Sequence, residues 1–394
     1  MTTTKYKSVY TPVFTDGSEY HIPTLKLLKQ DGSLYKGGKA PDIDKDKALR
    51  IYRAMVTTRI LDERMLGAQR QGRLSFYMQC TGEEASVIGS AAALDDADMI
   101  MAQYREQGAL AYRGFTIDEF MNQLFGNEKD YGKGRQMPVH YGSSKLNYMT
   151  ISSPLATQIP QATGYAYGQK MAGDGHCTIV YFGEGAASEG DFHAGLNMAA
   201  VHRVPAIFFC RNNGYAISTP ANEQFAADGI APRGFGYKMD TIRVDGNDIL
   251  AVYQATEAAR KLAVEENRPV LVEAMTYRLA AHSSSDDPSG YRSKDEEAVW
   301  REKDPILRMQ NWLTKKKWWS ESEEKELQER MRREVLETMK RAQKLPPPPL
   351  ETLVTDVYDE VPPLLNAQFE KLKAHIRKYP DEYPKSAAHV QGGA

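Results

Sequence analysis

The chain has 394 residues, which is enough for roughly two to three domains, or for one large α/β domain with appendages. Its 50 basic and 52 acidic side chains give a formal net charge of -2, so no overall positive field favours nucleic acid or an anionic membrane as a partner. The 3 cysteines lie far apart with no C-x-x-C pair, which argues against a disulfide framework and a structural zinc site.

Residues 1–45 are predicted to form an irregular N-terminal arm without a core of its own. Prolines and acidic residues are spread along them, and no arginine precedes Arg50, which is the wrong composition for an organelle transit peptide. No charged start is followed by the apolar stretch of a signal peptide, and no apolar run approaches the roughly 20 residues of a membrane helix. We therefore expect a cytoplasmic protein of bacterial type with no membrane or nucleic-acid partner.

Residues 46–305 alternate between helical and strand-like patterns. Apolar residues at helical spacing predict helices near 46–61, 83–94, 191–202 and 249–267, and short β-rich runs predict strands at 178–182, 206–210 and 270–274. Strands that alternate with helices are typical of βαβ units. The sequence therefore predicts an α/β fold with a doubly wound parallel sheet.

Residues 306–394 are predicted to form a helical tail for subunit contacts. Between 320 and 344, Leu327, Met331, Val335 and Met339 form one narrow apolar stripe on an otherwise charged helix. The four prolines at 346–349 end this helix, and a final charged helix follows. Because few tail residues could form a separate core, we expect the tail to dock on a neighbouring surface.

A glycine-rich run at 183–191 follows one predicted strand and leads into a predicted helix. Ser188 stands where a dinucleotide fingerprint needs its third glycine, so an NAD-binding Rossmann site is disfavoured. Glu184 lies between two glycines, which let the backbone approach a ligand closely. Free N–H groups at the start of the next helix would suit a phosphate.

A second polar turn, 211–215, follows the predicted strand at 206–210. Because one helix and one strand separate the two turns, both should emerge at the carboxyl edge of one parallel sheet, where doubly wound sheets bind ligands. Glu184, Asn213 and a backbone carbonyl near Tyr215 could then supply the hard oxygen ligands that magnesium prefers. Singly, each segment is an ordinary turn, and their shared spacing favours the ligand interpretation.

These segments resemble a known family. Gly-Asp-Gly followed some 25 residues later by Asn-Asn marks thiamine-diphosphate enzymes, and this chain has Gly-Glu-Gly at 183–185 and Asn-Asn at 212–213. Five segments are similar to the alpha subunit of branched-chain 2-oxo acid dehydrogenase, namely 134–140, 151–160, 183–191, 211–219 and 277–287. The resemblance extends from residue 46 to about residue 358.

The resemblance implies a fold, an activity and partners. Residues 46–305 would be the thiamine diphosphate-binding domain of an α2β2 heterotetramer, with the cofactor at the α/β interface. The enzyme would be a 3-methyl-2-oxobutanoate dehydrogenase (2-methylpropanoyl-transferring), which decarboxylates branched-chain 2-oxo acids oxidatively and acylates a lipoyl group on a partner acyltransferase core. Since the beta subunit supplies the carboxylate that activates the cofactor, the chain should be inactive alone.

The resemblance also assigns site residues. Magnesium would be held by Glu184, Asn213 and the Tyr215 carbonyl, and a structural potassium ion by Ser152, Pro154, Thr157 and Gln158. The cofactor would be bound by Tyr104, Arg105, Ser153, Leu155, Gly185, Ala186, Arg211 and His282. Among these, Arg105 and Arg211 would neutralise the diphosphate, Ser153 and Leu155 would meet the pyrimidine, and His282 and Ser153 would be catalytic.

His282 and the two arginines also have simpler explanations. A histidine in a serine-rich loop is more often merely exposed, and each arginine alone could form a surface ion pair. His282 follows the predicted strand at 270–274 and should reach the same sheet edge, where an imidazole can donate to a diphosphate and exchange protons. Relatives carry two adjacent histidines here, whereas Ala281 precedes His282 in this chain.

Two alternatives to the branched-chain enzyme remain at this point. One is the alpha subunit of pyruvate or acetoin dehydrogenase, which shares the cofactor and the reaction type. The segments 135–140 and 154–158 favour the branched-chain subfamily over it. The other is a non-catalytic assembly subunit that binds no cofactor, against which Glu184 and Asn213 argue.

Overall fold

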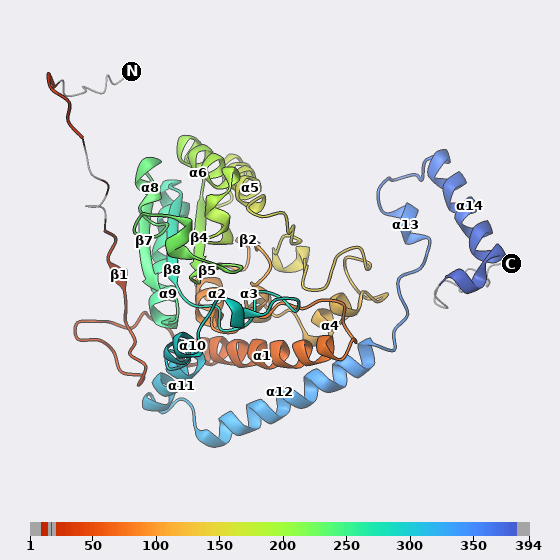
Figure 1. The fold of residues 1–394 in the computed structure, drawn as a ribbon, viewed down its shortest axis with the longest axis horizontal. Coiled ribbons are helices and arrows are strands. Elements are labelled where there is room, and N and C mark those ends of the chain that lie inside the picture. The colour runs from red at the N-terminus through yellow and green to blue at the C-terminus, as the bar shows by residue number, and fades with distance from the viewer. Residues whose placement is uncertain (1–8, 15–16, 18–20, 384–394) are drawn as a thin grey trace.

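A computed structural model describes residues 9–14, 17 and 21–383. Within them, six parallel strands form one sheet in the order β1-β7-β8-β4-β3-β2, with helices on both faces (Figure 1). The strands are β1 (Thr24–Leu25), β2 (Met99–Met101), β3 (Thr178–Gly183), β4 (Ala206–Asn212), β7 (Asp240–Asp245) and β8 (Val270–Met275). The predicted α/β fold with a doubly wound parallel sheet is confirmed.

The central strands are buried on both faces. Phe182 and Phe208 point into one apolar layer, whereas Tyr181 and Phe209 point into the other. The first layer is covered by α5 (Gln158–Ala172) and α6 (Gly190–His202); the second by α1 (Lys45–Arg70), α2 (Glu84–Ala92), α3 (Gln107–Arg113), α4 (Ile117–Phe125) and α9 (Ile249–Glu266). A strand that is buried on both faces needs apolar residues at every position, which is why β3 and β4 are continuous apolar runs in the sequence.

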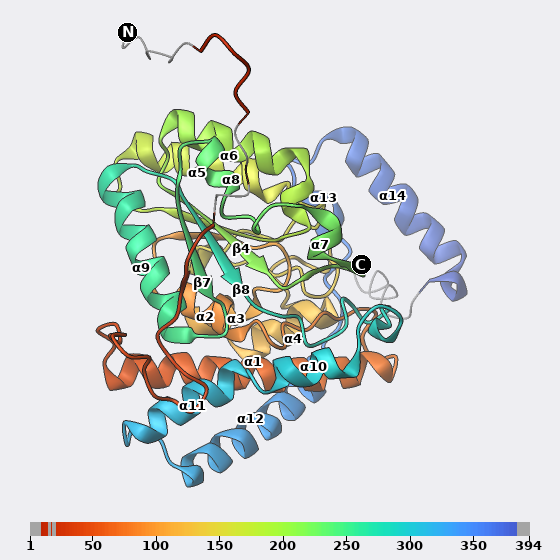
Figure 2. The same cartoon turned by 60° about the vertical axis from the view of Figure 1, so that its left-hand side comes forward.

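The predicted tail begins with helices that pack on the body of the same chain. α11 (Pro305–Lys315) and α12 (Glu321–Ala342) run along α1, as Figures 1 and 2 show. Leu327, Met331 and Val335 of the predicted stripe are buried against α1 and α4, in the same core that covers the sheet. The neighbouring surface to which this part of the tail docks is therefore its own chain.

Beyond α12 the chain leaves the body. α13 (Thr352–Thr355) and α14 (Pro363–Lys378) follow the proline run and lie apart from the sheet in Figure 1. Asp356 forms ion pairs with Lys133 at 2.6 Å and Arg135 at 2.8 Å, which tie this extension to the loop after α4. The division into arm, domain and tail, and a tail role in subunit contacts, stay predictions.

The arm contributes to the sheet, which the sequence did not predict. β1 pairs with β7, and Asp248 accepts hydrogen bonds from the N–H groups of Leu27 and Leu28, each at 2.6 Å. A two-residue strand carries no periodicity, and β2 and β7 were missed because they are short or interrupted by charged residues. Residues 1–8, 15–16, 18–20 and 384–394 of the predicted arm and tail lie outside the described residues.

The remaining elements are short. They are the hairpin strands β5 (Tyr215–Ala216) and β6 (Thr219–Pro220), the helices α7 (Ala221–Gln224), α8 (Arg233–Gly236) and α10 (Lys294–Arg301), and the 3-10 turns η2 (Ser144–Leu146), η3 (Ala186–Ser188), η4 (Pro288–Gly290) and η5 (Pro380–Glu382). Across the described ranges, no helix combines the length and the apolar character needed to cross a membrane.

Candidate active site

The carboxyl ends of β3 and β4 border a cavity of about 480 Å³. All residues predicted to bind the cofactor or magnesium line this cavity, namely Tyr104, Arg105, Ser153, Leu155, Glu184, Gly185, Ala186, Arg211, Asn213, Tyr215 and His282. The register explains the convergence, because Gly183 of β3 is paired with Arg211 of β4, so the turns that follow both strands open into the same space.

The first wall of the cavity is the loop 103–105. Glu106 precedes α3, and its Oε2 atom accepts hydrogen bonds from the backbone N–H groups of Gln103, Tyr104 and Arg105 at 3.0, 2.9 and 2.9 Å. The side-chain Oε1 atom of Gln103 accepts a hydrogen bond from the Gly183 N–H at 2.7 Å. These bonds fix the loop against the end of β3.

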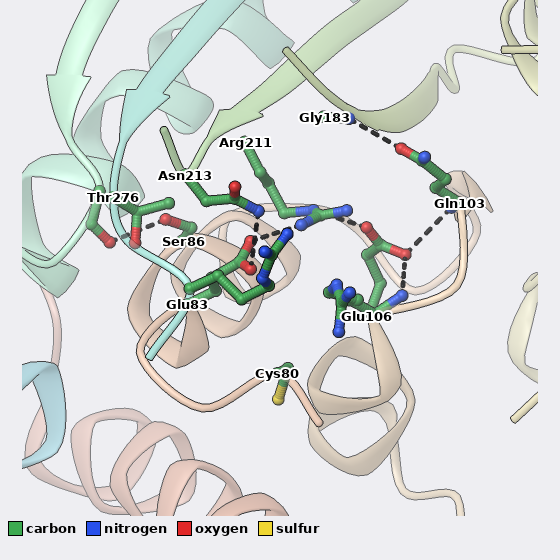
Figure 3. A network of polar contacts seen from close by, with 12 residues as sticks. Cys80, Glu83, Ser86, Gln103, Glu106, Gly183, Arg211, Asn213 and Thr276 are labelled. Atoms are coloured by element: carbon green, nitrogen blue, oxygen red, sulfur yellow. Dashed lines mark hydrogen bonds and ion pairs between the residues drawn. The ribbon is translucent and has the colours of Figure 1, made fainter. Parts of the chain in front are cut away.

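Arg211 lies at the centre of a buried polar network (Figure 3). Its Nε atom is 2.6 Å from Glu106 Oε1, its Nη1 atom donates to Glu83, and all three side chains are buried. Although burial opposes it, the carboxylates of Glu106 and Glu83 raise the pKa of Arg211 above its usual range. Sequence reasoning missed both glutamates, and only the folded chain brings them to Arg211.

Arg105 contacts His282. The Nη2 atom of Arg105 lies 3.1 Å from His282 Nδ1, and its Nη1 atom donates to the Gln79 carbonyl at 2.8 Å. Because a guanidinium can only donate, Nδ1 accepts and the neutral imidazole carries its proton on Nε2. Burial, followed by the charges of Arg105 and Arg278, lowers the pKa of His282 to about 4. His282 is therefore neutral near pH 7 and can donate through Nε2.

Arg278 is a further cation of the cavity that sequence reasoning missed. It is 1% exposed and donates to the carbonyls of Tyr215 at 3.2 Å and Ile217 at 2.5 Å, and to the Tyr291 hydroxyl at 3.1 Å. Within the described residues, neither Arg105 nor Arg278 forms an ion pair with a carboxylate. An unpaired buried cation is costly, so the cavity favours an anionic ligand.

The predicted magnesium ligands lie close together. Glu184 is 1% exposed, and its Oε2 atom accepts a hydrogen bond from the Asn213 N–H at 3.1 Å. Its buried Oε1 atom has no hydrogen-bond partner in the described part of the chain. Burial raises the pKa of Glu184 to about 7. The Tyr215 carbonyl accepts from Arg278 and keeps a second lone pair. An unpartnered carboxylate oxygen beside an amide and a carbonyl fits a hard cation.

The described residues include no cluster of three or more histidine, cysteine, aspartate or glutamate side chains that could hold a metal ion. The predicted magnesium set does not depend on such a cluster, since it has one carboxylate and takes its other oxygens from an amide and a backbone carbonyl. The remaining ligands of magnesium are typically phosphate oxygens and water.

The glycine-rich turn differs in detail from its prediction. The 3-10 turn η3 follows Gly185, and α6 begins only at Gly190, so the N–H groups nearest to Glu184 belong to a 3-10 turn rather than to a long helix. A Cβ atom on Gly185 would lie 2.7 Å from the Cβ atom of Ala216. A glycine at 185 therefore lets this turn pack closely against the hairpin β5–β6.

The residues predicted for potassium lie where the chain enters α5. The Thr157 hydroxyl donates to the Pro154 carbonyl at 2.8 Å, and Gln158 donates through Nε2 to the Tyr181 carbonyl at 2.9 Å. The buried Oε1 atom of Gln158 has no hydrogen-bond partner among residues 9–14, 17 and 21–383. Ala156 has a φ of 66°, so the backbone bends sharply here. Ser152 precedes this bend by four residues.

The sequence is similar to known proteins over most of its length. It matches the family described as the dehydrogenase E1 component over residues 52–351. The alpha subunit of mitochondrial 2-oxoisovalerate dehydrogenase from Dictyostelium discoideum is 54% identical over 368 residues, which are 93% of this chain and 83% of the relative. The human subunit is 51% identical over 92% of this chain and 82% of its own length, and alpha 1 of Arabidopsis thaliana is 49% identical over 94% and 78%.

These relatives correct one expectation from the sequence. Each of the three is named as mitochondrial, which contradicts the expected cytoplasmic, bacterial-type protein. That expectation was wrong; it rested only on the composition of residues 1–45. The chain belongs to the dehydrogenase E1 component family, whose members depend on thiamine diphosphate, and within it to the alpha subunits of branched-chain 2-oxo acid dehydrogenase.

Proposed function

We propose that the chain acts as the alpha subunit of a 3-methyl-2-oxobutanoate dehydrogenase (2-methylpropanoyl-transferring) component. It decarboxylates branched-chain 2-oxo acids oxidatively and transfers the acyl group to a lipoyl group on a partner acyltransferase core. The observation that carries this proposal is the chemistry of one cavity. Among the residues that the structure describes, Arg105 and Arg278 have no carboxylate partner there and a buried Glu184 oxygen has no partner. Such a cavity suits a magnesium diphosphate, which combines an anion with a cation.

Residues of this chain orient the magnesium diphosphate of the cofactor. Glu184, Asn213 and the Tyr215 carbonyl hold magnesium, while Arg105 and Arg211 face the diphosphate beside the backbone of Gly185. The remaining contacts come from Tyr104, Ala186, Ser153 and Leu155, the last two at the pyrimidine. Bound thiamine diphosphate supplies a nucleophilic carbon and an electron sink for decarboxylation.

His282 offers a hydrogen-bond donor at this site. Since Arg105 occupies Nδ1, the Nε2–H group is the one that can donate to a phosphate oxygen or to a substrate oxygen. A neutral imidazole near pH 7 keeps this proton and acts as a hydrogen-bond donor. Ser153 lines the same cavity and adds a hydroxyl donor.

A beta subunit completes the active site. Family membership implies this partner and an acyltransferase core, and we propose an α2β2 heterotetramer in which the beta subunit covers the cavity and supplies the activating carboxylate. A structural potassium ion bound by Ser152, Pro154, Thr157 and Gln158 would satisfy the free Gln158 oxygen. Replacing potassium by sodium should then lower the melting temperature of the assembly, and an unchanged value would argue against this ion.

The test is turnover by the assembly of this chain with its beta partner. Decarboxylation of 3-methyl-2-oxobutanoate should exceed that of pyruvate at least tenfold in kcat/KM, and the isolated chain should show none. Equal rates with both substrates would favour the pyruvate or acetoin enzyme. Robust turnover by the isolated chain would contradict the proposed division of the active site between two subunits.

A further inference from the structure

Two buried carboxylates share one guanidinium beneath the cavity. Glu83 immediately precedes α2 and Glu106 immediately precedes α3, and both are 0% exposed. Arg211, at the end of β4, bridges them, as Figure 3 shows. This network therefore joins the starts of two helices to the sheet edge at which the cofactor cavity lies.

Each carboxylate uses its other oxygen for a different part of the cavity wall. The Oε2 atom of Glu106 accepts hydrogen bonds from the three backbone N–H groups of the loop 103–105, which carries Tyr104 and Arg105. The Oε1 atom of Glu83 instead accepts from the side-chain Nδ2 atom of Asn213 at 3.1 Å. Glu106 thus orders the loop that carries Arg105, and Glu83 orients the side chain of Asn213.

We propose that Glu83 is a positioning residue for magnesium and that Glu106 is a positioning residue for the diphosphate, both anchored by Arg211. This inference rests on the proposed function and assigns separate tasks to two residues of the same network. Neither glutamate lines the cavity, so each acts through the residue that it holds.

The task of Glu83 follows from the chemistry of an amide. The two ends of the Asn213 side chain differ, since Nδ2 donates and Oδ1 accepts. A carboxylate can only accept, so Glu83 selects Nδ2 and directs Oδ1 the other way, where it accepts from the Tyr215 N–H at 3.2 Å. A glutamine at 83 would offer both a donor and an acceptor, and Asn213 could then present either end to a metal ion.

The task of Glu106 follows from convergent N–H groups. Three successive amides point at one carboxylate oxygen, which holds the loop 103–105 in a curve and places the Arg105 side chain beneath His282. A neutral side chain at 106 would bind these amides more weakly, because hydrogen bonds to an ionised acceptor are about twice as strong. The loop and Arg105 would then become more mobile.

Single substitutions can separate these tasks without removing the anchor. In Glu83→Gln the guanidinium of Arg211 remains paired with Glu106, and in Glu106→Gln it remains paired with Glu83. Substitution of Arg211 itself would leave two unpaired buried carboxylates, which is far more disruptive. The two glutamine variants are therefore the informative ones, and Glu63→Gln on the exposed side of α1 is the matched control.

The experiment measures binding to the assembly of this chain with its beta subunit by calorimetry. Glu83→Gln should raise the Kd of magnesium at fixed thiamine diphosphate at least tenfold, with less than a threefold change in the Kd of thiamine diphosphate at saturating magnesium. Glu106→Gln should show the reverse pattern, together with faster hydrogen exchange of the amides at 103–105. Glu63→Gln should change neither constant.

Two results would overturn the inference. One is unchanged binding in both glutamine variants, and the other is an equal loss of affinity for magnesium and for thiamine diphosphate in each variant. If Glu83→Gln does not fold, Glu83→Asp retains the charge for Arg211 but is too short to hold Asn213, and it should show the same selective loss of magnesium. If the unsubstituted assembly binds neither ligand, the proposed function fails. Hydrogen exchange at 103–105 in Glu106→Gln then still decides whether this carboxylate orders the loop.

Discussion

His282 and Arg105 show how single residues set the chemistry of the cavity. Arg105 fixes the imidazole tautomer by donating to Nδ1, and its charge adds to burial in lowering the pKa of His282 to about 4. The histidine is therefore a neutral donor, whereas a partner carboxylate would have made it a cation. Residue 281 is an alanine, and Nδ1 of His282 is held by Arg105.

We predict that His282 stays neutral well below the range in which histidines usually titrate. Its folded pKa of about 4 lies below the ordinary value of 6.5, so the unfolded chain binds this proton more readily between these values. The free energy of unfolding should thus fall as the pH decreases from 6.5 to 4. The stabilisation that comes from the lowered pKa of His282 should be fully present above pH 6.5. NMR of labelled imidazole groups, with His282→Asn for assignment, should show no titration of His282 above pH 5.

The same NMR experiment has a second arm. Arg105→Gln removes one of the charges that lower the pKa of His282, so its pKa should move up toward 6.5. A His282 signal that titrates near 6.5 in the unsubstituted protein, or an unchanged value in Arg105→Gln, would contradict this account of the tautomer and charge.

Gly185 gives a second prediction for a single residue. A Cβ atom there would lie 2.7 Å from Ala216, so Gly185→Ala should displace the turn that carries the Tyr215 carbonyl. We expect at least a tenfold weaker binding of thiamine diphosphate, which corresponds to about 1.4 kcal/mol, with little change in melting temperature. Gly190→Ala is the control, because its Cβ atom would meet no atom within 4 Å. Equal binding by both variants would refute this role.

Among the elements, those with a long apolar pattern could be predicted from the sequence. The strands β3, β4 and β8 and the stripe of α12 were located within about two residues, because burial fixes their composition along their whole length. The short strands β1 and β2 carry too few residues for a pattern. Helix α12 also shows that a stripe predicts burial without identifying the partner, which is α1 of the same chain.

In the candidate site, the residues that follow strands with a long apolar pattern could likewise be predicted from the sequence. Glu184 and Asn213 follow recognisable strands, and parallel pairing brings the ends of such strands together. Glu83, Glu106 and Arg278 could not be found in this way, because their contacts join loops that are far apart in the chain. Only the path of the folded backbone determines which of the many acidic residues reaches Arg211.

The packing of α12 can be tested with one pair of variants. Leu327 is 3% exposed within the core shared with α1, so Leu327→Ala should lower the free energy of unfolding by about 2–5 kcal/mol. Arg333→Ala on the exposed side of the same helix should change it by less than about 0.5 kcal/mol. Chemical denaturation measures both values. A small loss in Leu327→Ala would mean that α12 is not part of the cooperative core.

At the scale of the whole molecule, the outer side of α5 and α6 carries exposed apolar side chains. On α5 and α6, Tyr165 is 40%, Met171 69%, Met198 47% and Val201 70% exposed. Both helices start at the edge of the sheet where Ser153, Leu155 and Glu189 line the cavity. Because the proposed beta subunit has to cover that cavity, we expect it to pack on this face of α5 and α6.

A glycine on this face allows a test that leaves the fold intact. A Cβ atom at Gly164 of α5 would meet no atom within 4 Å, so Gly164→Leu should be tolerated by the isolated chain. In the assembly the added side chain should collide with the beta subunit, and co-expression followed by ultracentrifugation should show separate subunits. Gly67→Leu on α1, which is equally free of contacts, is the control. A normal assembly of Gly164→Leu would place the partner elsewhere.

The central claim is that Glu184 at the end of β3 organises a magnesium diphosphate site in this chain. Calorimetric titration of the assembly with thiamine diphosphate tests it most directly, with and without magnesium and in Glu184→Gln. Binding should require magnesium in the unsubstituted protein, and this magnesium-dependent binding should be lost in Glu184→Gln. Equal, magnesium-dependent binding by both proteins would contradict it.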